Sequence, residues 1–287
     1  MPIHRIVTHP GGAHKDDFLA CALLVHRHGV PIHRRDPSEP ELDDPTVCVV
    51  DVGGRHEPEK KNFDHHQFPR DHPPVCALSL VLQDLGIYED AKAFCEWLEV
   101  AEWFDCRGPQ ETARYLGVER EVLNQLNSPA DVTLLIRFAR AEELNPGDPL
   151  WEVMRMIGHD MITYVSSLRE RLDFIGRHAE WWAVDSPNGP VEALFLPRTD
   201  PMPAESSQGL ERFVVQTGRE DSTQALLYPD RRGNGYALSR FNDSQQMDFT
   251  QIDSCEDVHF AHVRGFVAKS SATEPARLKE LLSQARV

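Results

Sequence analysis

The pattern of apolar and polar positions over the first third of the chain predicts strands and helices in alternation. Residues 3–8 are predicted to form a short strand. After the turn at Gly11-Gly12, the stretch DDFLACALLVHRHG is apolar on most sides, which predicts a buried helix. PIHRR follows as a possible edge strand, and the nearly continuous apolar run TVCVVDV is typical of a parallel strand buried on both faces. This order predicts an α/β domain with a doubly wound, mainly parallel sheet.

The pattern changes in the second half of the chain. A long amphipathic stretch from about Leu150 to His178 predicts a linker helix. Beyond it lie short strand-like runs, EWWAVD, VEALFL, QALLYPD and YALSRF, separated by the turn signals SPNGP and DRRGNG. A final helix is predicted in EPARLKELLSQA. We therefore expect one domain over residues 1–179 and a second, smaller α+β domain over residues 180–287, facing each other across a cleft.

Composition and charge narrow the class of protein. The 287 residues are 40% hydrophobic and 26% charged, as in ordinary soluble globular proteins. No run of about 18 apolar residues exists, and the first residues lack the apolar core of a signal peptide, so we expect a cytoplasmic protein. The formal net charge of −16 disfavours a broad surface for long nucleic acid, but it permits a small cation-lined pocket. The six cysteines form no Cys-x-x-Cys pair, which favours buried thiols over disulfides.

Histidine and aspartate gather where the predicted strands end. Ten of the 14 histidines lie in the first quarter of the chain. His9 follows the first predicted strand and Asp51 ends the run VCVV, so both are expected at the carboxyl edge of the sheet, where open α/β sheets bind ligands. His14 and Asp16 follow in the next loop and the start of the helix. Asp17 is better explained as a cap of that helix.

The stretch NFDHHQ adds three further polar side chains in consecutive positions. Asp64, His65 and His66 can converge on one point only if the backbone turns there in a loop. Asp105 ends a predicted helix, where a carboxylate opposes the helix dipole and a bound cation would account for it. The candidates thus comprise His9, His14, Asp16, Asp51, Asp64, His65, His66 and Asp105.

Imidazoles and carboxylates without thiolates suit Mn²⁺, Mg²⁺, Fe²⁺ or Co²⁺ better than structural zinc. So many candidate ligands exceed the needs of one ion, which favours two ions bridged by a carboxylate. Two such ions polarise a phosphoryl oxygen and activate water. The residue pattern therefore predicts hydrolysis of a phosphoester or phosphoanhydride.

The same residues lie in blocks that resemble a known family. DHH with an upstream strand-end aspartate resembles the DHH phosphoesterase superfamily. The longer blocks THPGGAHKDDFLACALL and VVDVGGRHEPEKKNFDHHQ are similar to the melanocyte-proliferating-gene-one family within it. The resemblance covers most of residues 3–108 and, more weakly, residues 224–268, where VHFAHVRGF is similar to a Phe-x-His-x-x-Gly-Phe segment of the accessory domain.

This resemblance implies a DHH-type catalytic domain, an accessory substrate-binding domain and two Mn²⁺ or Mg²⁺ ions. Asp51 would bridge both ions. The shell of one ion would be completed by His9 and His14, and that of the other by Asp16, His65 and Asp105. Family members are described as metal-dependent hydrolases, with 3′–5′ exonuclease activity on RNA in at least some of them.

The resemblance also implies roles toward the substrate. His66 would face the scissile phosphate, and Asp64 would orient the neighbouring histidines. In the accessory domain, His262 with Arg264 and Gly265 would bind a substrate phosphate. The sequence departs from the family pattern at FDCRG and HVRG.

We therefore expect a metal-dependent phosphoesterase, with a 3′–5′ exonuclease acting on RNA or short oligonucleotides as the leading hypothesis. The expected partners are a short RNA, oligonucleotide or nucleotide and no membrane, and a homodimer is left open. One alternative is a small-molecule phosphatase or cyclic-dinucleotide phosphodiesterase. Another is a metal-bound regulator that binds nucleotides or RNA without catalysis. The Walker A, Gly-x-Gly-x-x-Gly and Gly-x-Ser-x-Gly motifs are absent from the sequence.

Overall fold

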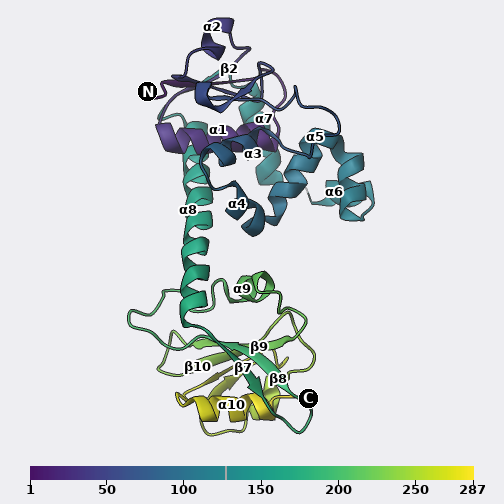
Figure 1. Cartoon of the computed structure of the whole chain (residues 1–287), viewed down its shortest axis with the longest axis vertical. Helices are drawn as coiled ribbons and strands as arrows, with labels where there is room; N and C mark the ends of the chain where they lie inside the picture. Colours follow the sequence, from purple (N-terminus) through teal and green to yellow (C-terminus); the bar gives the residue numbers. More distant parts are fainter. Residues whose placement is uncertain (127) are drawn as a thin grey trace. The chain divides into compact units, whose positions relative to one another are not determined.

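The structure is a computed structural model that describes residues 1–126 and 128–287. The chain divides into two compact units, residues 1–166 and 167–287, and the division falls within the long helix α8 (Pro149–His178). Within the described residues, each unit holds a six-stranded sheet of its own (Figure 1). The domain boundary predicted after residue 179 lies just beyond the end of the same helix.

The sheet of the first unit is mixed and mainly parallel. In spatial order its strands are β4 (His56–Glu57), β5 (Asn62–Phe63), β3 (Val47–Val50), β1 (Arg5–Thr8), β2 (Ile32–Arg34) and β6 (Glu143–Leu144). The inner strands β5, β3, β1 and β2 run parallel to one another, whereas β4 and β6 add antiparallel at the two edges. The four residues of β3 are all buried, as the apolar run predicted. The predicted α/β fold class is confirmed.

One strand that was expected at the edge of the sheet lies inside it. PIHRR, predicted as a possible edge strand, contains β2, but β6 pairs outside it and takes the edge. β6 has only two residues and lies more than a hundred positions further along the chain. Such a short segment gives no periodic signal of its own, so the pairing depends on tertiary packing.

Helices flank this first sheet, and α1 is largely buried. The helical segments of the first unit are α1 (Lys15–His28), α2 (Glu39–Leu42), η1 (Pro58–Lys60), α3 (Ala77–Asp84), α4 (Tyr88–Phe94), α5 (Glu96–Leu116), α6 (Arg120–Gln125) and α7 (Pro129–Arg140). α1 is buried from Ala20 to Val25 without interruption and ends at Gly29, which adopts the left-handed conformation with φ 66°. That continuous burial agrees with the apolar stretch in its sequence.

The prediction that Asp105 ends its helix was wrong. Helical residues continue past it, and α5 runs to Leu116 with a kink at Gly108, whose φ of 76° and ψ of 170° are not helical. Glycine takes this conformation at little cost, and the following Pro109 has no N–H to lose at a new helical start. Asp105 therefore lies in the last turn before the kink.

The second unit is an α+β domain built on a mostly antiparallel sheet. In spatial order its strands are β11 (Val258–Ala261), β12 (Val267–Ser270), β10 (Tyr236–Arg240), β9 (Thr223–Pro229), β8 (Val191–Phe195) and β7 (Glu180–Val184). β8 and β9 pair in parallel, and the other neighbours pair antiparallel. The helical segments of this unit are α9 (Leu210–Gln216), η2 (Phe249–Ile252) and α10 (Pro275–Gln284). The predicted second α+β domain is confirmed.

The core of the second unit lies between its sheet and α10. Trp182, Phe195, Leu227 and Leu238 of the sheet pack in one cluster with Leu281 of α10. Along β7, the buried Trp182 and Val184 alternate with more exposed residues.

Two further expectations can be compared with the structure. Among the described residues, no helix is long and apolar enough to cross a membrane. All six cysteines, each in the described part of the chain, are free thiols, and four of them are buried.

Candidate metal centre and substrate pocket

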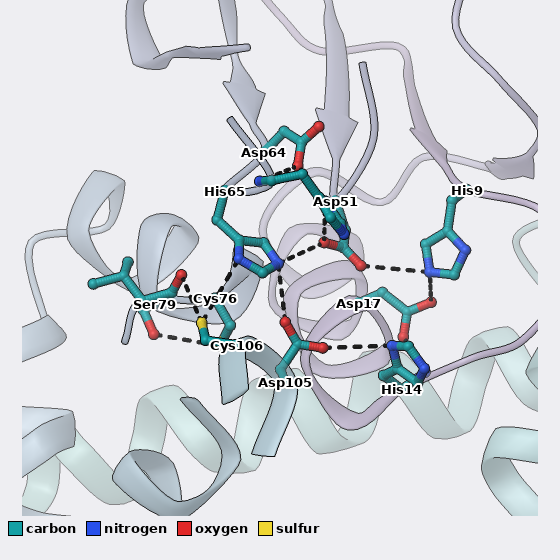
Figure 2. A network of polar contacts seen from close by, with 12 residues as sticks. His9, His14, Asp17, Asp51, Asp64, His65, Cys76, Ser79, Asp105 and Cys106 are labelled. Carbon is teal, nitrogen blue, oxygen red and sulfur yellow. Dashed lines mark hydrogen bonds and ion pairs between the residues drawn. The ribbon is translucent and has the colours of Figure 1, made fainter. Parts of the chain in front are cut away.

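Three neighbouring parallel strands end at one edge of the first sheet, and a candidate ligand follows each of them. His9 follows β1, Asp51 follows β3 and Asp64 follows β5. Because β5, β3 and β1 are adjacent and parallel, their carboxyl ends place these side chains together. Figure 2 shows His9 and Asp51 pointing toward one another beneath the strand ends.

The turn after β3 explains the sequence DVGG. Asp51 adopts a left-handed backbone conformation with φ 57°. Gly53 follows with φ 96°, and a Cβ atom there would lie 2.8 Å from Leu42 Cδ2. The Gly54 N–H donates a hydrogen bond of 2.6 Å to Asp64 Oδ2. The two glycines therefore let the chain turn tightly enough to bring Asp51 next to the DHH loop.

Asp51 lies between two imidazoles at the centre of the cluster. Its Oδ1 is 3.1 Å from His65 Nε2 and its Oδ2 is 3.4 Å from His9 Nε2. Asp105 connects the other side, with Oδ2 2.9 Å from His65 Nε2 and Oδ1 3.4 Å from His14 Nδ1. The five side chains form an arc of alternating imidazoles and carboxylates (Figure 2).

All six predicted metal ligands belong to this cluster. In each of four groups of three residues, one ligand atom per residue lies within 4.8 Å of the others. The groups are His9, His14 and Asp51; Asp51, His65 and His66; His65, Asp105 and Cys106; and His14, Asp16 and Asp105. The structure thus brings together the residues that were predicted to bind metal, and it adds Cys106.

The buried carboxylates of this cluster lack hydrogen-bond donors. Asp16 is 1% exposed, and neither of its oxygens has a hydrogen-bond partner; Asp51 Oδ1 lacks one as well. Burial raises the pKa of Asp16 well above its usual value and also raises the pKa of Asp51. A buried carboxylate without donors is costly unless a cation balances its charge. The donor set therefore fits divalent metal ions.

His9 and His65 each direct Nε2 toward the carboxylates of the cluster. His9 Nδ1 donates to the Pro10 carbonyl at 3.0 Å, which leaves Nε2 facing Asp51. His65 Nδ1 lies 3.7 Å from Cys106 Sγ, whose thiol donates to the Val75 carbonyl. Metal-binding histidines commonly have the second nitrogen fixed in this way. Because its thiol is used here, Cys106 acts more readily as a support for His65 than as a ligand.

Acidic neighbours raise the pKa of both histidines. The Asp17 carboxylate, 3.1 Å from Nε2, raises the pKa of His9 to about 9. Burial lowers the pKa of His65, but the contacts with Asp105 and Asp51 outweigh it and raise this pKa to about 12. Although burial raises the pKa of Asp105, the contacts with His14 and His65 hold this pKa below its usual value. Divalent cations would compete with these protons for the same nitrogens.

Asp64 and His66 form a pair beside the cluster. His66 Nδ1 donates to Asp64 Oδ1 at 2.7 Å, and the His66 backbone N–H donates to the same oxygen at 3.1 Å. Although burial raises the pKa of Asp64, the hydrogen bonds from His66 and Gly54 lower it below the usual value. The His66 side chain is 64% exposed, which leaves Nε2 accessible. Asp64 thus orients His66 with a charged, buried acceptor.

Asp17 caps α1 as predicted, and it has a second contact that the sequence did not indicate. Its Oδ1 accepts hydrogen bonds from the backbone N–H groups of His14 and Phe18, both at 2.8 Å. Its Oδ2 lies near His9 and is 3.5 Å from the guanidinium of Arg34.

Arg34 was not predicted as a site residue, because a single arginine in a strand gives no functional signal. It is 4% exposed and donates to the carbonyls of Gly12 and Phe138, both at 2.8 Å. It thereby connects β2 and α7 to the loop between His9 and His14.

Known proteins resemble the N-terminal part of the chain. Residues 5–72 match the family MYG1_exonuc, described as an uncharacterised protein family (UPF0160). That segment contains five of the six predicted metal ligands and the DHH loop. Residues 5–72 are thus similar to the MYG1 family.

Individual relatives match over the same part. The chain is 45% identical to a MYG1 exonuclease of Rattus norvegicus over 67 residues, 22% of this chain and 17% of the relative. It is 43% identical to the Homo sapiens MYG1 exonuclease over the same length and coverage. A MYG1 protein of Chlamydia trachomatis is 43% identical over 72 residues, 23% of this chain and 24% of the relative. The matched part thus spans less than a quarter of the length of each of these relatives.

Among solved structures, a pGpG-specific phosphodiesterase from Vibrio cholerae aligns with 99% of this chain and 98% of its own, at 14% identity and a TM-score of 0.29.

A pocket of about 710 Å³ opens over the cluster in the MYG1-like unit. Its lining includes five residues already described, His9, His14, Asp51, His65 and Asp105, together with Asp64 and His66. The remaining wall is formed by residues that follow the DHH loop and by residues of α5, among them Phe68, Arg70, His72 and Arg107. Phe68, Arg70 and Arg107 were not predicted as site residues.

The predicted substrate-binding residues of the accessory domain lie in the connection between β11 and β12. The His262 N–H donates to Val267 O at 2.9 Å, and the Gly265 N–H donates to His262 O at 2.7 Å. Gly265 has φ 68°, a conformation that favours glycine, and a Cβ atom there would lie 2.0 Å from Asp248 Oδ1 and displace that side chain. Arg264 is exposed. A role of these three residues in substrate binding stays a prediction.

Proposed function

We propose that this protein is a divalent-metal-dependent phosphoesterase that removes nucleotides from the 3′ end of RNA or short oligonucleotides. The observation that carries the proposal is the convergence of six imidazole and carboxylate ligands at one sheet edge, where buried carboxylate oxygens have no hydrogen-bond donor. Relatives named MYG1 exonuclease share the segment that contains five of these ligands, which supports a phosphoesterase.

The donor set would hold two Mn²⁺ or Mg²⁺ ions, with Asp51 between them. One ion would be bound by His9, His14 and Asp51, and the other by Asp16, Asp51, His65 and Asp105. When bound, such ions neutralise charge on a phosphoryl group and activate water for attack. Nitrogen and oxygen ligands without a thiolate suit these metals.

The chain's own contribution to the reaction is to position a proton-carrying group next to the phosphate. Asp64 is buried and fixes the Nδ1–H of His66, so the ring presents Nε2 to the pocket in one orientation. A protonated His66 can donate its Nε2 proton to the oxygen that leaves the phosphorus, while its Nδ1–H stays bound to Asp64. Cys106 and Pro10 fix the tautomers of His65 and His9 in the same way.

Incubation of the purified protein and Mn²⁺ with a 5′-labelled single-stranded RNA oligomer tests the proposal. We expect products shortened by single nucleotides, no reaction in EDTA, and no reaction with Asp51→Asn. Asp221→Asn, which neutralises an exposed aspartate of the second unit, serves as the matched control.

Two results would contradict the proposal. An intact oligomer together with turnover of phosphate monoesters or cyclic dinucleotides would assign the site to small molecules. Equal activity of Asp51→Asn and the unmodified protein would show that the cluster takes no part in the reaction.

A further inference from the structure

The pocket over the cluster has a second wall whose chemistry differs from that of the ion ligands. We call Phe68, Arg70, His72 and Arg107 the aromatic–arginine wall; all four line the pocket. The carboxylates that line this pocket, among the described residues, are those of the cluster and of Asp64. The wall itself therefore carries only positive and aromatic groups.

The aromatic part of the wall is a fixed pair of rings. Phe68 and His72 stack with centroids 4.5 Å apart and an angle of 23° between the rings, and His56 meets Phe68 edge-on at 5.8 Å. The backbone N–H of Phe68 donates to His65 O at 3.0 Å, and that of His72 donates to Pro69 O at 2.9 Å. These bonds tie the ring pair to the DHH loop.

The two arginines of the wall can bind an anionic group of a ligand in the pocket. Arg107 donates from Nη2 to His72 O at 2.5 Å, which holds its guanidinium beside the ring pair. Arg70 is exposed and forms no ion pair within the described part of the chain. Two arginines on one wall stand out in a chain with a formal net charge of −16. Arginine pairs well with phosphate because its planar group can donate two parallel hydrogen bonds.

We propose that the aromatic–arginine wall binds the nucleotide next to the cleaved bond. The base of that nucleotide stacks on the Phe68–His72 pair, and a second, uncleaved phosphate pairs with Arg70 and Arg107. The inference rests on the proposed function and specifies its substrate as a short oligonucleotide with a terminal 5′-phosphate. The volume of about 710 Å³ exceeds what one phosphate needs and is typical of sites for ligands of this size.

Kinetics on two diribonucleotides test the arginine part. With Mn²⁺, kcat/KM is measured for the 5′-phosphorylated adenosine dinucleotide, pApA, and for ApA, which lacks the 5′-phosphate. We expect the unmodified protein to prefer pApA and Arg70→Gln to lower this preference about tenfold or more, as loss of a charged hydrogen bond does. Arg120→Gln, an exposed arginine outside the pocket, is the matched control and should keep the preference.

Two substitutions of one residue test the aromatic part. Loss of a stacked base typically costs about 5- to 100-fold in binding, so Phe68→Leu should raise KM for pApA by a factor in this range. Phe68→Tyr keeps a ring of similar size and should restore KM to near the original value. A purely structural role of Phe68 would instead lower the stability of both variants and leave KM unchanged.

The outcomes separate this inference from the proposed function. An unchanged preference for pApA in Arg70→Gln would overturn the wall as a subsite, and so would an equal KM in Phe68→Leu, Phe68→Tyr and the unmodified protein. The proposed function would still stand if the unmodified protein hydrolyses the substrate and Asp51→Asn does not. If the unmodified protein cleaves neither these dinucleotides nor the RNA oligomer, the proposed function fails. The affinity of the Mn²⁺-loaded variants for pApA, measured by calorimetry, then tests the subsite independently. Arg70→Gln and Phe68→Leu should bind pApA more weakly than Phe68→Tyr and the unmodified protein, and equal affinities would overturn the subsite.

Discussion

Asp51 combines burial with an unusual backbone conformation. It is 3% exposed and has φ 57°, a left-handed conformation that costs a non-glycine residue about 1–2 kcal/mol. Its backbone N–H is held by Phe63 O at 3.0 Å, so the adjacent strand fixes the turn. The conformation directs one carboxylate toward both His9 and His65. A bridging position between two ions would explain why this strain is maintained.

The raised pKa of His9 leads to a prediction about stability and pH. A group whose pKa rises from 6.5 to about 9 on folding contributes stability that is fully present below pH 6.5 and is lost as the pH rises through 9. Protein treated with EDTA should therefore lose thermal stability between these values. Excess Mn²⁺ should reverse the trend, because metal binding displaces the same protons.

Thermal unfolding measured from pH 6 to pH 9.5, in EDTA and in Mn²⁺, checks this prediction. His9→Gln is the comparison variant, and its melting temperature should depend less on pH both in EDTA and in Mn²⁺. Parallel pH profiles in EDTA and Mn²⁺ would show that the cluster does not bind the ion through these nitrogens.

The Asp64–His66 pair leads to a second prediction at the scale of residues. Asp64→Asn keeps the size of the side chain but removes the charge that fixes His66, and we expect kcat to fall about 10- to 100-fold. His66→Ala should lower kcat about 10²- to 10⁴-fold, as loss of a general acid does. Because Asp64 acts through His66, the double variant should be no slower than His66→Ala alone.

Steady-state kinetics on pApA with saturating Mn²⁺ provides the measurement. Multiplying losses in the double variant would mean that the two residues act separately, and a loss of Mn²⁺ affinity in Asp64→Asn would assign it to the metal instead.

At the scale of elements, the close approach of α8 to α1 supports the unit that carries the site. Gly158 of α8 is buried, and a Cβ atom there would lie 2.1 Å from Ala22 O of α1. Trp151 of α8 donates from its indole to Val30 O at 2.9 Å, just beyond α1. Because the first turn of α1 carries Asp16 and Asp17, the position of this helix determines where these carboxylates lie.

Gly158→Ala should therefore destabilise the protein. The added methyl group cannot be accommodated without moving backbone, and overpacking of this kind costs about 1–3 kcal/mol. The matched control is Gly176→Ala in the same helix, where a Cβ atom would lie 3.4 Å from Phe213 Cε2 and alanine favours the helix. Calorimetric melting of both variants is the measurement, and equal melting temperatures would contradict the close contact.

The elements also show which parts of the structure the sequence could predict. Strand ends carry His9 and Asp51, and a local pattern sufficed because parallel strands must place their carboxyl ends at one edge. The continuation of α5 beyond Asp105 could not be predicted, because helix and kink there depend on Gly108 and on packing. Arg34, Cys106 and Arg107 were missed for the same reason: their contacts join segments far apart in the chain.

At the scale of the whole molecule, charge distinguishes short substrates from long ones. The chain has 46 acidic and 30 basic residues, with a sequence pI of about 5.3. Proteins that follow a long nucleic acid use a basic surface, and their affinity falls steeply as salt rises. Here the aromatic–arginine wall offers positive charge locally, while phosphates that extend beyond the pocket meet a chain with an excess of acidic residues. Each phosphate that a longer substrate adds outside the pocket is repelled by the acidic chain, and this repulsion offsets the attraction between the phosphate in the pocket and the arginines.

We therefore expect kcat/KM for pApA to exceed that for a single-stranded RNA of about 20 nucleotides at least tenfold at an ionic strength of about 0.05 M. Between about 0.05 and 0.2 M salt the difference should narrow, since the Debye length shortens to about 8 Å at 0.15 M and screens charges outside the pocket more than those within it. Kinetics at constant free Mn²⁺ and increasing NaCl would show this convergence. A preference for the longer RNA that weakens steeply with salt would instead require an extended basic surface and would contradict this prediction.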